Sequence, residues 1–109
     1  MEEVEKNVIE WLKLGVIEPA WSKYHSPIFA VAMKNGGIRL VQDFRALNAE
    51  THINKYCMRD ITECVGEIGH SKSTILSRLD LTAGFRQMLL ETSSRPYTAF
   101  TVPGQGQFQ

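Results

Sequence analysis

One carboxylate, Asp80, lies where a metal ion or the phosphates of a nucleotide could be held. It follows a run of β-forming residues, 74–79, and precedes a turn of small residues, Thr82-Ala83-Gly84. A buried strand would fix the carboxylate, and the turn would leave backbone N–H groups free beside it. The same pattern fits an aspartate that only caps the turn. On this stretch alone, phosphate or metal chemistry and simple turn capping are both open.

Two cations lie on a predicted β-hairpin earlier in the chain. Residues 28–33 form an apolar run, an Asn-Gly pair is a strong signal for the turn, and residues 38–44 alternate between polar and apolar. Lys34 falls near the tip of this hairpin and Arg39 on its return strand. They could belong to a solvated turn, or they could be cations directed at a polyanion.

The other predicted elements would position these groups. Apolar residues at helical spacing predict a helix over 2–14 and another over 61–68, the second capped by Asp60. We expect a turn or short helix at 45–48 and a strand over 97–102. That last strand would lack a partner among the remaining residues.

Composition limits the function classes. The 109 residues carry twelve acids and twelve bases, so the formal net charge is zero, which argues against a free-standing basic nucleic-acid binder. The bases are concentrated between residues 34 and 59, however, and could form a basic patch. The two cysteines and three histidines have no metal-binding spacing. Without a signal peptide or a long apolar run, we expect a soluble intracellular protein.

Three blocks, taken in order, resemble the reverse transcriptases of Gypsy-type LTR retrotransposons and of retroviruses. They are Gly15-Val-Ile-Glu-Pro19 with Ser26-Pro27, then Arg39-Leu-Val-Gln-Asp43-Phe-Arg-Ala-Leu-Asn48, and finally Leu79-Asp-Leu-Thr-Ala-Gly-Phe85 with Thr98-Ala-Phe100. The match covers residues 8–109. The resemblance implies an α+β fold, the fingers and palm of a right-hand polymerase. Residues 1–73 would form fingers and a connection, and residues 74–109 would begin an incomplete palm sheet with flanking helices.

The resemblance also implies nucleotidyl transfer by a two-metal mechanism in the complete protein, with Mg²⁺ or Mn²⁺ as cofactor. The partners would be dNTP and a primer on an RNA or DNA template, with no membrane. Asp80 would be a catalytic carboxylate and, with the backbone carbonyl of Leu81, a metal ligand. The ring of Phe85 would exclude a ribose 2′-hydroxyl. The triphosphate would be bound by two cations and two backbone N–H groups, those of Lys34, Arg39, Ala83 and Gly84.

Asp43 and Arg45 lie two residues apart and could pair, as structural residues with a possible contact to the template.

The sequence departs from the family at Lys55-Tyr56-Cys57-Met58-Arg59, where Lys-Tyr-Pro-x-Pro is usual, so two prolines are missing. It also contains no Tyr-x-Asp-Asp motif. We therefore expect a fragment whose remaining palm, thumb and RNase H regions are missing. Two alternatives are open: a non-enzymatic module that binds nucleic acid or a partner, and an inactive remnant.

We expect the purified 109-residue chain to give no primer extension with Mg²⁺. One carboxylate cannot hold two metal ions in an in-line site, and removing members of such a unit costs nearly all of its effect. Extension of a labelled primer on an RNA or DNA template measures this activity. Clear extension above a no-protein control would contradict the prediction.

Overall fold

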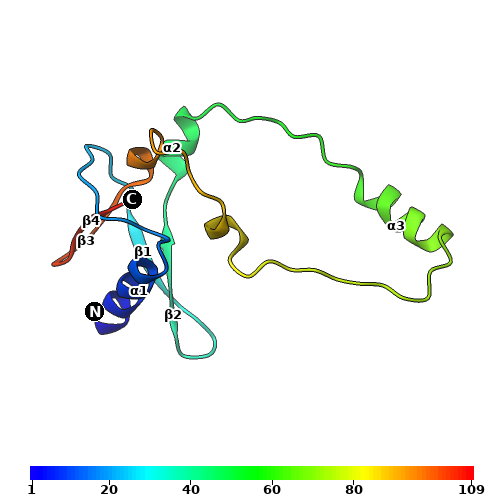
Figure 1. Cartoon of the computed structure of the whole chain (residues 1–109), viewed down its shortest axis with the longest axis horizontal. Coiled ribbons are helices and arrows are strands. Elements are labelled where there is room, and N and C mark those ends of the chain that lie inside the picture. The colour runs from blue at the N-terminus through cyan, green and yellow to red at the C-terminus, as the bar shows by residue number, and fades with distance from the viewer. The chain divides into compact units, whose positions relative to one another are not determined.

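The computed structural model describes all 109 residues, which divide into two compact units. One unit combines residues 1–51 with residues 84–109, and the other comprises residues 52–83. The first unit contains both β-sheets and every buried apolar side chain, whereas the second contains one helix between two extended segments (Figure 1). The expected boundary between fingers and palm near residue 73 stays a prediction, because packing rather than function defines these units.

The first unit is an α+β arrangement, as expected. Its helices and strands are α1 (Glu2–Lys13), β1 (Ile28–Ala32), β2 (Ile38–Gln42), α2 (Arg45–Glu50), the 3₁₀ helices η1 (Gly84–Gln87) and η2 (Arg95–Thr98), β3 (Phe100–Val102) and β4 (Gly106–Phe108). Strands β1 and β2 form one two-stranded sheet, and β3 and β4 form the other. No helix is both long enough and apolar enough to span a bilayer.

The predicted hairpin is confirmed. Strands β1 and β2 pair antiparallel with Ile28 opposite Gln42, and the turn between them uses a positive φ of 84° at Gly36. Glycine adopts this conformation without the steric cost that a Cβ would bring. Because side chains alternate along β2, Leu40 is buried while Arg39 is exposed. The hairpin therefore offers one face to the core and its arginine to solvent.

Helix α1 packs on β2 and supplies the first part of the core (Figure 1). The acidic residues of its first turn interact favourably with the helix dipole. Gly15, with a positive φ of 70°, follows the helix where the sequence predicts its end. The side chain of Val8 is fully buried. The core cluster of buried residues consists of Val8, Leu40, Phe100, Val102 and Phe108.

The last strand is shorter than predicted, and the expectation that it lacks a partner is wrong. Residues 95–98 form η2 instead, since Pro96 suits the first turn of a helix but cannot donate to a β-ladder. Strand β3 then pairs with β4, which the turn at 103–105 returns antiparallel. Backbone hydrogen bonds of 3.0 Å in both directions between Glu18 and Gln109 attach the chain's end to the first loop.

The second unit is built around α3 (Ile61–His70), which Asp60 caps as predicted by accepting a 2.7 Å hydrogen bond from the Thr62 N–H. Residues 52–59 and 71–83 have no strand, so the predicted strand over 74–79 is wrong, and Asp80 is exposed rather than buried. A β-strand requires a hydrogen-bonded neighbour, and neither sheet of the chain includes these residues. A run of β-forming residues does not by itself provide such a neighbouring strand.

Replacing Phe100 by alanine should lower the free energy of unfolding by about 3–5 kcal/mol, or leave the chain unfolded at room temperature. Its ring is 2% exposed and packs against Phe108 with 5.9 Å between ring centroids. Urea denaturation followed by circular dichroism measures the change. Phe85→Ala is the matched control: that ring is 98% exposed, so stability should change by less than about 0.5 kcal/mol. Equal losses would contradict the assigned core.

Candidate functional site

A cavity of about 900 Å³ within the first unit brings together two of the residues expected to bind a nucleotide, Arg39 and Phe85. Arg39 reaches it from β2, and Phe85 from η1. The floor is apolar and includes Leu40 and Phe100. The cavity is open to solvent, since the Phe85 ring is 98% exposed, and its apolar lining with a few charged groups can contact one side of an organic anion.

The charge of this cavity is positive. Its lining includes the arginines Arg39, Arg86 and Arg95 but only one acid, Glu18. Glu18 lies 3.3 Å from Arg95 and accepts a 2.8 Å hydrogen bond from the Gln109 amide. These contacts lower the pKa of the Glu18 carboxyl, Gln109 first and then Arg95, so the acid stays charged and offsets Arg95. No carboxylate pairs with Arg39 or Arg86, which leaves two cations for an anionic ligand.

Arg86 is held by an aromatic contact that the sequence did not suggest. Its guanidinium lies 4.2 Å from the centre of the Trp11 ring, a cation–π geometry that joins η1 to α1. A guanidinium stacked in this way still has N–H groups at its edge to donate to an anion. The only sequence signal for Arg86 is its place directly after Phe85, and Trp11 gives no signal beyond its place on the apolar side of a helix.

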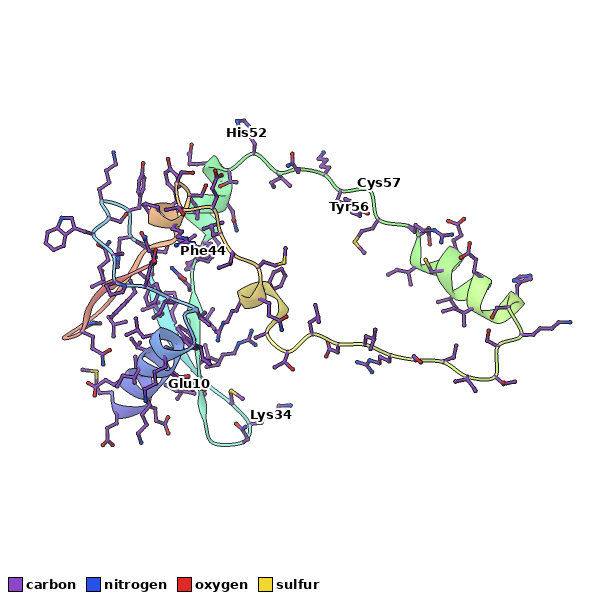
Figure 2. The ribbon with its side chains drawn as sticks, in the orientation of Figure 1. Glu10, Lys34, Phe44, His52, Tyr56 and Cys57 are labelled. Atoms are coloured by element: carbon purple, nitrogen blue, oxygen red, sulfur yellow. The ribbon has the colours of Figure 1, made fainter.

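The other predicted nucleotide-binding residues lie elsewhere. Lys34 is exposed at the tip of the hairpin and does not line the cavity (Figure 2). Gly84 begins η1, next to Phe85. Asp80, Leu81 and Ala83 belong to the second unit, where Ala83 has a positive φ of 47°. The predicted site residues thus belong in part to one unit and in part to the other, and their roles stay predictions.

The residues of this chain do not by themselves fit a two-metal centre. No group of three or more His, Cys, Asp or Glu side chains is arranged to hold a metal ion. Asp80 offers one carboxylate and Leu81 one backbone carbonyl, whereas two ions bound side by side need several shared oxygen ligands. Any metal-dependent step would therefore require carboxylates in addition to Asp80.

The expected pairing of Asp43 with Arg45 is confirmed. Arg45 Nη2 lies 2.7 Å from Asp43 Oδ2, and the backbone N–H of Arg45 donates to Asp43 Oδ1 at 3.0 Å. These hydrogen bonds from Arg45 lower the pKa of Asp43 to about 2. The pair lies at the start of α2 with the arginine almost fully exposed, so it orders the β2–α2 connection beside the cavity.

Comparison with known proteins identifies this region. No family model matches the chain. The Retrovirus-related Pol polyprotein from transposon opus of Drosophila melanogaster is 39% identical over 112 residues, which cover 97% of this chain and 11% of that protein. The Enzymatic polyprotein of Cauliflower mosaic virus (strain Strasbourg) is 37% identical over 112 residues, 99% of this chain and 16% of the relative. The Retrovirus-related Pol polyprotein from transposon gypsy of Drosophila melanogaster is 36% identical over 107 residues, 93% of this chain and 10% of the relative.

Among solved structures, the Protease-Reverse Transcriptase CSH mutant of Prototype Foamy Virus superposes with a TM-score of 0.76 at 25% identity, over 97% of this chain and 14% of that one. The fold is therefore that of an α+β segment of a retroviral reverse transcriptase. The chain belongs to the reverse transcriptase region of the Pol polyproteins of retrotransposons and retroviruses. It spans only about 10–16% of the length of these relatives.

The carboxyl group of Asp43 should titrate with a midpoint near pH 2. Because the folded pKa lies below the ordinary value of 3.8, the pair's stabilisation is present above that value and is lost as pH falls through about 2. Carboxyl ¹³C NMR measures the midpoint. Arg45→Gln should return it toward 3.8, whereas Arg59→Gln, which removes an arginine of α3's ion pairs, should leave it unchanged. A midpoint near 3.8 in the unmodified chain would contradict the assigned pair.

Proposed function

We propose that this chain forms the dNTP-binding part of an RNA-directed DNA polymerase, comprising the fingers and the beginning of the palm. The observation that carries the proposal is the cavity that joins Arg39 and Arg86 to the ring of Phe85. It offers unpaired cations to a triphosphate and an aromatic surface to the sugar. Membership of the reverse transcriptase region supports the same conclusion.

Each group has a definite task in this proposal. Arg39 binds phosphate oxygens with two parallel N–H donors, which fixes the orientation of the triphosphate as a single point charge would not. Lys34, at the hairpin tip, adds such a point charge from outside the cavity. Phe85 contacts the sugar and excludes a 2′-hydroxyl. Arg86 joins η1, the short helix that carries Phe85, to α1 through its contact with Trp11.

The reaction proposed for the complete protein is nucleotidyl transfer to a primer 3′-hydroxyl, directed by an RNA or DNA template. Asp80 supplies one of the carboxylates, beside the backbone groups of Leu81, Ala83 and Gly84. A divalent ion bound in the complete protein would supply Lewis-acid chemistry, and Asp80 would be one of the residues that hold it. Because Asp80 alone provides too few oxygen ligands for two metal ions, the residues of this chain bind the nucleotide but do not complete the catalytic centre.

Arg39→Ala should weaken binding of dATP to the chain by about tenfold or more, because a charge-assisted bidentate contact is lost. Amide chemical-shift titration by NMR measures the dissociation constant and locates the bound nucleotide. Lys13→Ala removes a cation at the end of α1, outside the cavity, and should leave the affinity unchanged.

A second variant tests the sugar contact separately. Phe85→Val should bring the affinities for ATP and dATP closer together while it changes dATP affinity less than Arg39→Ala does. The proposal fails if dATP shifts no amide of β2 or η1, or if Arg39→Ala and Lys13→Ala have the same effect.

A further inference from the structure

A tryptophan that is fully exposed to solvent lies in the loop over residues 19–25, here named the Trp21 loop. Trp21 takes no part in the core or in the cavity that contains Arg39. Exposing an entire indole is unfavourable in water, and large exposed apolar groups often mark binding surfaces. The neighbouring groups indicate what it could bind.

The loop is fastened to the second sheet and is not a loose segment. The Gln107 side chain accepts a 2.7 Å hydrogen bond from the Ser22 N–H and donates to the carbonyls of Ser22 and Tyr24 at 2.8 and 3.0 Å. The Ser22 hydroxyl donates to the Pro96 carbonyl at 2.7 Å. One glutamine from β4 thus uses both ends of its amide on the loop. The indole is presented by a pre-ordered backbone, which reduces the entropy lost on binding.

Two tyrosine rings and one lysine lie on or beside the Trp21 loop. The rings of Tyr24 and Tyr97 lie 4.7 Å apart, and the Lys23 ammonium lies 5.5 Å from the Tyr24 ring centroid. Trp21, Lys23 and Gln107 line an open hollow of about 700 Å³ that shares no residue with the nucleotide cavity.

Lys23 is the one charged residue that lines the hollow. The Trp21 loop, η2 and β4 contain no aspartate or glutamate, so no acid of these segments opposes Lys23. The nearest acid in sequence, Glu18, pairs with Arg95. Exposed rings interleaved with positive charge are the pattern by which proteins bind single-stranded nucleic acid, because bases stack on the rings and phosphates pair with the cations.

We propose that the Trp21 loop is a stacking site for single-stranded nucleic acid. An unpaired base stacks on the Trp21 indole, and Lys23 pairs with a flanking phosphate. Paired bases in a duplex do not expose their faces in this way, so single strands are preferred. A protein partner fits less well, because the residues on either side of the indole, Ala20 and Ser22, provide little apolar area. The inference rests on the proposed nucleic-acid function of the chain but uses different residues.

The test is binding of a fluorescein-labelled dT₁₂ to the 109-residue chain, measured by fluorescence anisotropy over a series of salt concentrations without nucleotide. Trp21→Ala should weaken binding about tenfold and leave the salt dependence unchanged, since stacking carries no charge. Trp21→Phe should retain most of the affinity. Lys23→Gln should reduce the slope of log K against log salt by about 0.7, the value for one phosphate contact on a single strand.

Two variants serve as matched controls: Leu14→Ala removes another exposed apolar side chain, and Lys13→Gln another cation. Neither should change the affinity or the slope. Circular dichroism should show that Trp21→Ala, which alters only a solvent-exposed side chain, stays folded. A blunt-ended hairpin duplex of the same length should bind more weakly than dT₁₂.

Three results would overturn the inference: unchanged dT₁₂ affinity in Trp21→Ala, equal losses in Leu14→Ala, or a change in self-association in place of oligonucleotide binding. A wild-type chain that binds dATP through Arg39 but not dT₁₂ would overturn this inference and leave the proposed nucleotide site standing. A chain that binds dT₁₂ through Trp21 but does not bind dATP would support this inference and overturn the proposed nucleotide site.

Discussion

The structure depends on the packing of α1 and the hairpin strand β2 against the aromatic pair of the second sheet. Val8 is enclosed between elements that lie almost a hundred residues apart in sequence, and Phe100 and Phe108 close the other side. Only six apolar residues are buried, so each contributes a large share of the stability. The cavity that contains Arg39 is lined in part by these same elements, which makes its shape depend on the core.

The polar contacts at the edge of this core join segments that are distant in sequence. Glu18 pairs with Arg95 and accepts from Gln109, so it offsets one arginine of the cavity and also attaches the chain's end to the first loop. Gln107, one strand position from the core ring of Phe108, orders the Trp21 loop. Because side chains along β4 point alternately to opposite faces, Phe108 lies in the core while its neighbour Gln107 contacts the loop.

Local patterns predicted most of the helices and the hairpin, since their signals are short-range. The Asn-Gly turn, the glycine after the first helix and the Asp60 cap act through bonds within a few residues. Predictions failed where a distant partner decides the outcome. The β-forming run 74–79 has no neighbouring strand, and the strand expected to be unpaired acquires β4. Trp11 and Arg86 could not be matched in advance, because neither side chain reveals that the other is nearby.

The sequence alone determined the family, through three blocks in the right order, and the local signals that begin and end its elements. Those features depend on residue types and spacing, which a sequence contains in full. Tertiary structure alone decided that Arg39 and Phe85 line one cavity with Arg86, that Glu18 offsets Arg95, and that Gln107 holds the Trp21 loop. The physical reason is that these contacts join residues far apart along the chain, and only the packing of the core sets which of them meet.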